Sequence, residues 1–135
     1  MKWKQLSVFL ENKPGALSEP CRLLARAGIN IETFSLADTR EFGILRLVVD
    51  DSDKARRLLQ RNGFAVKITS LPVVEVPDKP GALAAILDAL GGTGINLKYG
   101  YGFSFRPGSK AVLVFSFDDP EGAAEILAKK GFKLI

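Results

Sequence analysis

The amino-acid sequence predicts an α+β protein that contains the same small unit twice. Three short blocks recur in the same order, 66 to 68 residues apart. They are KPGAL at residues 13–17 and 79–83, GIN at 28–30 and 94–96, and GF at 63–64 and 131–132. Within each copy, stretches with a period of two residues alternate with stretches of helical period. We therefore expect one unit in residues 1–69 and a second in residues 70–135.

Each copy begins with a predicted strand and a predicted helix. The strand has apolar residues at alternate positions, which are Leu6, Val8 and Leu10 in one copy and Pro72, Val74 and Val76 in the other. Pro-Gly opens the helix, whose expected buried stripe is Leu17, Cys21 and Leu24 in one copy and Leu83, Ile86, Leu87 and Leu90 in the other. Gly28 and Gly94 are expected to end the two helices. Pro20 has no N–H, so we expect it to kink or shorten the first helix.

The remaining elements of each copy are two strands, a short helix and a last strand. The strands are expected at residues 31–38 and 44–49 in the first copy and at 97–105 and 111–117 in the second. Each short helix starts at an Asp or Ser cap and carries an apolar pair, Leu58-Leu59 or Ile126-Leu127. Gly63 and Gly131 end these helices, and the last strands follow. The order βαββαβ is the ferredoxin-like pattern, which predicts a four-stranded antiparallel sheet with both helices on one face.

The two units are expected to pack as a pseudo-dimer. Units of this size bury little core alone, and the connector at residues 69–72 is too short for a flexible tether. The second copy has about two extra residues, which we place in the turn at residues 105–109.

Strand alternation also predicts which side chains face away from the helices. Counting from Leu97, the aromatic residues Tyr99, Tyr101, Phe103 and Phe105 fall on the helix-covered face, and the intervening glycines on the open face. In the first copy the open face is expected to carry Phe34, Leu36, Ile44 and Val48. Exposed apolar surface of this kind usually marks an interface. We therefore expect a homodimer formed by contact between sheets.

Composition excludes several classes of function. The chain has 135 residues, 47% of them hydrophobic, and no apolar run approaches a membrane span. The N-terminus lacks the apolar core of a signal peptide, so a cytoplasmic protein is expected. Histidine is absent and Cys21 is the single cysteine, which excludes intrachain disulfides, Cys/His zinc sites and imidazole-based catalysis. We expect no enzymatic activity, no metal and no cofactor. The acidic runs at residues 50–53 and 118–119 are interpreted as helix caps.

The loop and exit motifs resemble those of the ACT domain. The sequence Asn12-Lys13-Pro14-Gly15-Ala16-Leu17 followed by Gly28-Ile29-Asn30 in a βαββαβ unit is similar to that family, and the similarity extends over both halves of the chain. ACT domains are small regulatory modules that bind amino acids, often as pairs. The resemblance implies a stand-alone tandem ACT protein with no enzyme domain attached.

The resemblance also implies a ligand site between paired units, built from the first strand–helix loop of one and strand residues of its neighbour. The expected ligand-binding residues of the first copy are Leu10, Asn12, Gly15, Ala16, Leu17, Asn30 and Ile31. Those of the second copy are Val76, Asp78, Gly81, Ala82, Leu83, Asn96 and Leu97. The start of a helix offers free N–H groups to a carboxylate, and asparagine both donates and accepts. Leu10 and Val76 are expected to form an apolar wall with no basic residue beside it. Asp78 in place of Asn12 predicts two non-equivalent sites or a single working site.

The function expected from these features is a regulatory or sensor protein that binds a free amino acid. Without an effector domain, its output would pass through a regulated enzyme, another protein partner or self-association. Pro-Gly and the asparagines also occur as ordinary turn residues, an interpretation weakened by their repetition at the same spacing. The alternative is a nucleic-acid-binding module that uses the basic surface and the aromatics of residues 99–105, since the net charge is +4. Cys21 is expected to be a small core residue.

Overall fold

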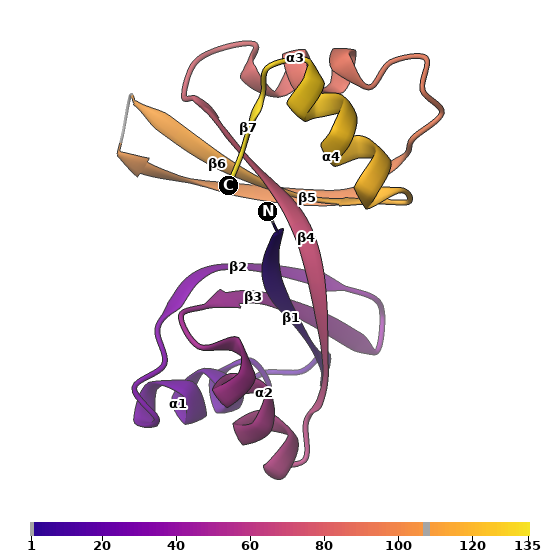
Figure 1. The fold of residues 1–135 in the computed structure, drawn as a ribbon. Helices are drawn as coiled ribbons and strands as arrows, with labels where there is room; N and C mark the ends of the chain where they lie inside the picture. The colour runs from indigo at the N-terminus through magenta and orange to yellow at the C-terminus, as the bar shows by residue number, and fades with distance from the viewer. Residues whose placement is uncertain (1, 107–108) are drawn as a thin grey trace. The chain divides into compact units, whose positions relative to one another are not determined.

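The chain folds into two compact units in this computed structural model, which describes residues 2–106 and 109–135, the side chains of 104–106 excepted. The N-terminal unit is Lys4–Ser70. The C-terminal unit is Leu71–Ile135 together with residues 2 and 3. Each unit has the order βαββαβ with an antiparallel sheet and two helices (Figure 1), which confirms the predicted ferredoxin-like fold.

The N-terminal unit has the strand order β2-β3-β1-β4. Its elements are β1 (Lys2–Glu11), α1 (Ser18–Arg26), β2 (Ile31–Asp38), β3 (Phe42–Val49), α2 (Ser52–Arg61) and the first half of β4 (Ala65–Pro77). Its core lies between the sheet and the helices and includes the alternating residues Leu6, Val8 and Leu10, as the sequence predicts. Asp51 caps α2 by accepting a hydrogen bond from the N–H of Lys54, which confirms one of the predicted caps.

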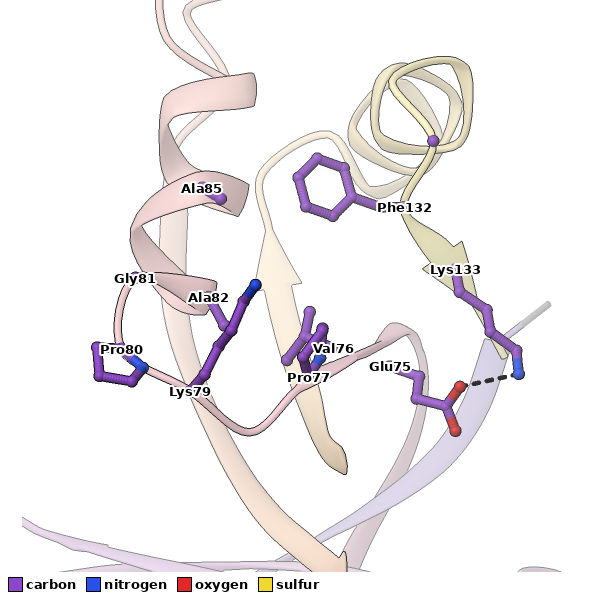
Figure 2. Close-up of a pocket in the computed structure, with 11 residues that line it drawn as sticks. Glu75, Val76, Pro77, Lys79, Pro80, Gly81, Ala82, Ala85, Phe132 and Lys133 are labelled. Carbon is purple, nitrogen blue, oxygen red and sulfur yellow. Dashed lines mark ion pairs between the residues drawn. The ribbon is translucent and has the colours of Figure 1, made fainter. Parts of the chain in front are cut away.

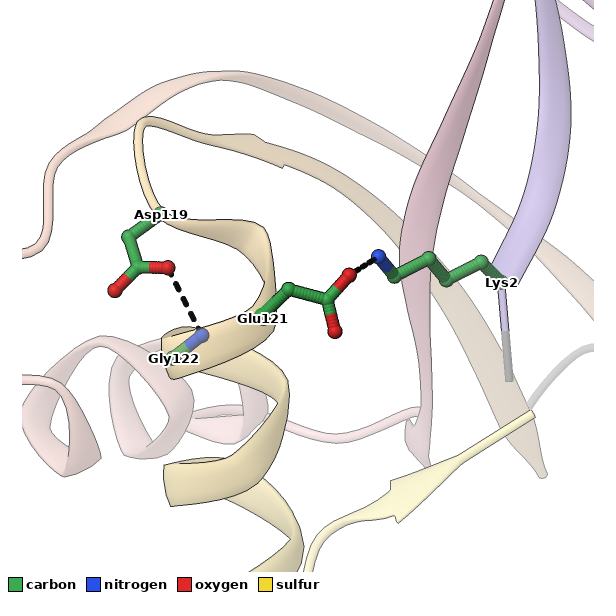
Figure 3. Close-up of polar contacts among 4 residues, drawn as sticks. All are labelled: Lys2, Asp119, Glu121 and Gly122. Atoms are coloured by element: carbon green, nitrogen blue, oxygen red, sulfur yellow. Dashed lines mark hydrogen bonds and ion pairs between the residues drawn. The ribbon is translucent and has the colours of Figure 1, made fainter.

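The C-terminal unit has the order β5-β6-β4-β7. Its elements are the rest of β4, α3 (Ala82–Ala89), β5 (Leu97–Arg106), β6 (Lys110–Phe117), α4 (Pro120–Lys129) and β7 (Lys133–Leu134). The helix-covered core contains Val74, Val76, Phe115 and Phe117. Asp119 caps α4 at the N–H of Gly122, and the neighbouring Glu121 forms an ion pair with Lys2 from the start of the chain (Figure 3).

The expected connector between the copies is part of a strand. β4 runs without a break through 13 residues, and residues 69–72 lie inside it. Its first half is the last strand of the N-terminal unit and its second half is the first strand of the C-terminal unit. The turn expected to hold two extra residues contains positions 107 and 108, which lie outside the described residues.

The first helices of the two units differ in position as well as in sequence. α1 begins at Ser18, whereas α3 begins at Ala82, the counterpart of Ala16. Pro20 accounts for the difference, because a later start places it in the first turn, where no N–H is needed. The helix starts later, but it is not shorter overall, because α1 has 9 residues and α3 has 8. α3 ends at Ala89 rather than at Gly94, because two glycines follow closely and Gly92 has a φ of 77°.

The predicted buried stripe on the first helices is correct only in part. Ile86, Leu24 and Leu90 are buried. Leu83 and Leu87 are instead 48% and 41% exposed, so the prediction was wrong for these two leucines. They lie on an apolar surface of α3.

The predicted faces of β2 and β5 were wrong, for the same reason in both units. Each strand pairing shifts register near its start, between Ile31 and Thr33 and between Leu97 and Tyr99. Such a bulge inserts one residue and reverses the alternation beyond it. Phe34 and Leu36 pair with Leu47 and Leu45 and therefore lie on the helix-covered side, exposed at the sheet edge; the predicted open-face residue Val48 is buried, and Ile44 is half-buried.

In the C-terminal unit the same bulge places the aromatics away from the helices. Tyr99, Tyr101 and Phe103 pack with Trp3, Leu71, Val73, Val112 and Val114 in a separate cluster. The glycines lie on the helix side, where a Cβ at Gly100 would come within 3.0 Å of Phe115. The side chain of Phe105 lies outside the described residues.

Candidate functional site

The loop between the first strand and the first helix is tied to the neighbouring hairpin in the N-terminal unit. The backbone N–H of Asn12 donates to the carbonyl of Glu41 at 2.9 Å, and its side-chain Nδ2 donates to the carbonyl of Thr39 at 3.0 Å. In the C-terminal unit the N–H of Asp78 donates to Ser109 at 2.9 Å, so the backbone bond is kept. A carboxylate cannot donate, so Asp78 cannot repeat the side-chain bond of Asn12.

The same loops each contain a glycine in the left-handed backbone conformation. Gly15 has a φ of 84° and Gly81 a φ of 91°, a region that other residues occupy at a cost. Among the described side chains none caps α1 or α3, in contrast to the aspartate caps of α2 and α4. The helix dipole gives the start of each of these helices a partial positive charge that suits an anion. Ser18 and Ala82 already donate to the carbonyls of Gly15 and Lys79, and Pro20 has no N–H, so α3 has more first-turn N–H groups to offer than α1.

A pocket of about 480 Å³ opens beside the loop of the C-terminal unit (Figure 2). It brings together three predicted site residues, Val76, Gly81 and Ala82. Its other lining residues are Glu75, Pro77, Lys79, Pro80, Ala85, Gly131, Phe132 and Lys133. In Figure 2, Lys79 extends between the start of α3 and the ring of Phe132, and Glu75 and Lys133 lie to one side.

Most of the residues that line this pocket were not predicted from the sequence. The expectation of no basic residue beside the apolar wall was wrong, because Lys79 and Lys133 line the pocket. Lys79 belongs to the repeated KPGAL block and Phe132 to the repeated GF block. The repetition of both blocks was a usable signal, but nothing in the sequence indicates that they meet.

The N-terminal unit has two smaller pockets around its loop. One, of about 240 Å³, is the counterpart of the large pocket and includes the predicted residues Leu10 and Ala16. Its other lining residues are Phe9, Glu11, Lys13, Glu19 and Phe64. The second, of about 60 Å³, lies on the other side of the loop and includes Leu10, Asn12, Ala16 and Leu17 with Leu36, Asp38 and Gly43.

The predicted asparagines of the GIN blocks lie away from these loops. Within the N-terminal unit Leu10 pairs with Gly43 and Gly43 with Asp38, whereas Ile31 pairs with Val49 near the other end of the sheet. Asn30 therefore lies at the end of the sheet opposite Asn12, and a site that uses both must draw on two units.

Both GIN asparagines take part in the same backbone arrangement. The N–H of Asn30 donates to the Asp50 carboxylate at 3.1 Å, and that of Asn96 donates to Asp118 at 3.0 Å. Both asparagines are exposed, while Ile31 and Leu97 pack against the cores. Asp78, Leu83, Asn96 and Leu97 line none of the three pockets described above.

Within the part of the chain that the structure describes, the pKa values of Glu75 and Cys21 are shifted. The pKa of Glu75 is lowered, first by a hydrogen bond from Lys133 and further by the charge of Lys110. The Nζ atoms of Lys133 and Lys110 lie 2.8 Å and 3.4 Å from Oε2 of Glu75. Partial burial raises the pKa of the Cys21 thiol, which favours the unreactive protonated form and agrees with a structural role.

The aromatic strand offers little to nucleic acid. Tyr99, Tyr101 and Phe103 are half-buried, and the Phe103 ring packs against Trp3 with 6.0 Å between centroids. Bases stack on rings whose faces are free, so these contacts disfavour the alternative function of nucleic-acid binding.

Among residues 2–106 and 109–135 no acidic, histidine or cysteine cluster could hold a metal ion. Within the same ranges, no helix has the length and apolar character needed to cross a membrane.

Comparison with known proteins agrees with the duplicated fold. The family model "ACT domain pair" matches residues 1–135. The crystal structure of protein BT0572 from Bacteroides thetaiotaomicron is 39% identical, covers 100% of this chain and 92% of that chain, and superposes with a TM-score of 0.93. The ligand-free regulatory subunit of aspartate kinase from Thermus thermophilus is 16% identical, with coverages of 95% and 92% and a TM-score of 0.65, and shares the fold.

A curated relative matches part of the chain. The acetolactate synthase small subunit of Buchnera aphidicola is 33% identical over 82 residues, which is 58% of this chain and 50% of that protein. The match thus spans about half the length of this relative.

Proposed function

The chain belongs to the ACT domain pair family, and we propose that it is a regulatory protein that binds a free amino acid. The observation that carries the proposal is the pair of Lys-Pro-Gly loops, each beside a pocket and each at the start of a helix without a side-chain cap. A zwitterion needs a donor for its carboxylate and an acceptor for its ammonium, and such loops supply both kinds of group. The ACT family's role in amino-acid binding supports the same assignment.

The binding groups proposed are the loop residues of one unit and residues of a neighbouring unit. Asn12 and Asn30 lie at opposite ends of one sheet. Both can contribute to one ligand only when the loop of one unit meets the GIN segment of another. We propose that residues 1–69 and 70–135 are the two domains concerned, and that their interface holds the ligand.

Regulation would follow if the ligand binds different arrangements of the paired units with unequal affinity. A ligand that binds one arrangement of paired units more tightly shifts the population toward it. The output proposed is contact with another protein or self-association as a homodimer in the cytoplasm. The exposed apolar residues Phe34, Leu36 and Phe42, which are 59%, 50% and 56% exposed, offer a surface for either. We further propose that the chain has no catalytic activity of its own.

Calorimetric titration of the chain with each of the twenty amino acids tests the proposal. We expect saturable binding of one amino acid or a few related ones, with no more than two per chain. Absence of binding by all twenty to a folded protein would refute it.

Asn30→Ala tests the contribution of the GIN segment. We expect weaker binding, by about tenfold for one lost hydrogen bond to a charged group, with an unchanged urea midpoint because Asn30 is exposed. Its backbone N–H bond to Asp50 survives the substitution. An unchanged dissociation constant would remove Asn30 from the site.

A further inference from the structure

We infer that the amino acid binds in the C-terminal unit, in the pocket lined by Lys79, and that this pocket prefers an amino acid with an apolar side chain. The inference rests on the proposed function and adds which unit binds and which chemical class is selected. It is argued from the differences between this pocket and its counterpart in the N-terminal unit.

The first difference is the charge available to a carboxylate. In the N-terminal unit Nζ of Lys13 lies 3.0 Å from Oε2 of Glu11, so its charge is already neutralised. The counterpart of Glu11 is Pro77. Within the described part of the chain no acidic side chain pairs with Lys79, whose ammonium group extends along the pocket (Figure 2). Lys79 is therefore freer than Lys13 to attract a carboxylate.

The charged residues that line each pocket support the same conclusion. The N-terminal pocket is lined by Glu11, Glu19 and Lys13, a net charge of −1. In the C-terminal pocket Pro77 and Ala85 replace these two glutamates, and Glu75 pairs with Lys133 on the opposite face of the sheet, which leaves the charge of Lys79. A ligand's α-carboxylate is repelled by the first set and attracted by Lys79.

Glu75 does not contribute its carboxylate to the apolar wall of this pocket. Val76 packs in the helix-covered core, so the side chain of the preceding residue, Glu75, lies on the opposite face of the sheet. There it pairs with Lys133 and Lys110. The charge of Lys79 is therefore the one that a ligand on the helix side meets.

The second difference is room for a side chain of apolar character. The C-terminal pocket is about 480 Å³ against about 240 Å³ for its counterpart. Ala85 stands where the N-terminal unit has Glu19, and Ala82, Val76 and the Phe132 ring complete an apolar wall. Packing on these groups favours aliphatic or aromatic side chains, whereas a hydroxyl or a second charge would lose its hydration without a partner.

Calorimetry with L-leucine and L-phenylalanine, against L-serine and L-glutamate, tests the inference on the full chain. We expect the first two to bind at one per chain and at least about tenfold more tightly than the others. Lys79→Ala should weaken binding of L-leucine by at least about tenfold, because it removes a charged donor. Pro77→Glu, which introduces the neutralising carboxylate of the N-terminal unit, should do the same with Lys79 still present.

Lys13→Ala is the matched control and should leave the dissociation constant within about twofold. Lys79 and Pro77 are exposed, and the fluorescence of Trp3, the single tryptophan, reports whether the C-terminal unit stays folded. If L-leucine binds Lys79→Ala as tightly as the unaltered chain, if Lys13→Ala weakens it instead, or if polar amino acids bind best, the inference is overturned and the proposed function stands. If none of the twenty amino acids binds, both fail.

Discussion

The edge strands of the two units carry opposite kinds of residue at equivalent positions. Phe34 and Leu36 on β2 pair with Leu47 and Leu45 and are largely exposed. On β5 the corresponding residues are Gly100 and Gly102, which pair with Phe115 and Leu113. Phe115 is 3% exposed and lies over the glycine backbone. One unit therefore presents its edge for contact, while the other covers its edge with its own side chains.

The comparison teaches that duplication has preserved the fold and changed the surfaces. Both cores use the same alternating strand positions, and both second helices begin with an aspartate cap. The differences fall at the edge strand, at the start of the first helix and in the loop pocket. These are positions where a substitution alters binding without removing the core, as expected for two halves that have acquired separate roles.

The largest loss of stability is expected from substitutions in the two cores. These substitutions test whether the two units unfold separately. Leu127 and Leu59 occupy equivalent positions in α4 and α2, and both are fully buried. Each Leu→Ala change should cost about 2–5 kcal/mol. Trp3 packs in the C-terminal unit, so urea unfolding followed by its fluorescence should respond to Leu127→Ala far more than to Leu59→Ala. Equal responses would mean that the units unfold as one.

Exchange of the edge residues should produce the next largest effect. In Gly102→Ala the new Cβ would lie 2.7 Å from Cδ2 of Leu113 and 2.9 Å from the carbonyl oxygen of Val112. Such overpacking should lower the free energy of unfolding by about 1–3 kcal/mol. Leu36→Ala at the equivalent position is the control and should cost less than about 1 kcal/mol, because Leu36 is half exposed. Equal costs for the two variants would show that the edges are packed alike.

The smallest effect expected is the pH dependence of the C-terminal unit. The folded-state pKa of Glu75 lies below the ordinary value of 4.5, so its ion pairs contribute fully above that pH. The contribution is lost as the pH falls through the lower folded-state pKa. Glu75→Gln should therefore lower the urea midpoint at neutral pH and reduce its further decline below about pH 4.5. Parallel pH profiles for the two proteins would exclude Glu75 as a source of this dependence.

Much of the fold could be predicted because its determinants are local. Alternation along β1 and β4, the Asp51 and Asp119 caps, and the left-handed Gly28 each depend on a few neighbouring residues. The repeated blocks placed these elements in the same order in both units. The effect of Pro20 was predicted only in part, because the lack of an N–H moves the start of its own helix without shortening it.

The faces of β2 and β5 could not be predicted by the same reasoning. A single inserted residue near Thr33 or Tyr99 reverses every side chain that follows. A bulge depends on the partner strand, so counting positions along one strand does not reveal it. The predicted faces of β2 and β5 failed for this reason, whereas Ile44 and Val48 on β3 lie on the face opposite the core residues Leu45 and Leu47, as predicted.

The duplicated βαββαβ order and the same strand–helix loop in each half could be predicted from the sequence, since repeats and periodicity are properties of the chain alone. The tertiary structure decided which groups surround each loop. Lys79 is followed by Phe132 and Lys133 more than fifty residues later, and only folding brings the three to one pocket. The different charges of the two loop pockets follow from such contacts, and therefore so does the inference that the two halves bind unequally.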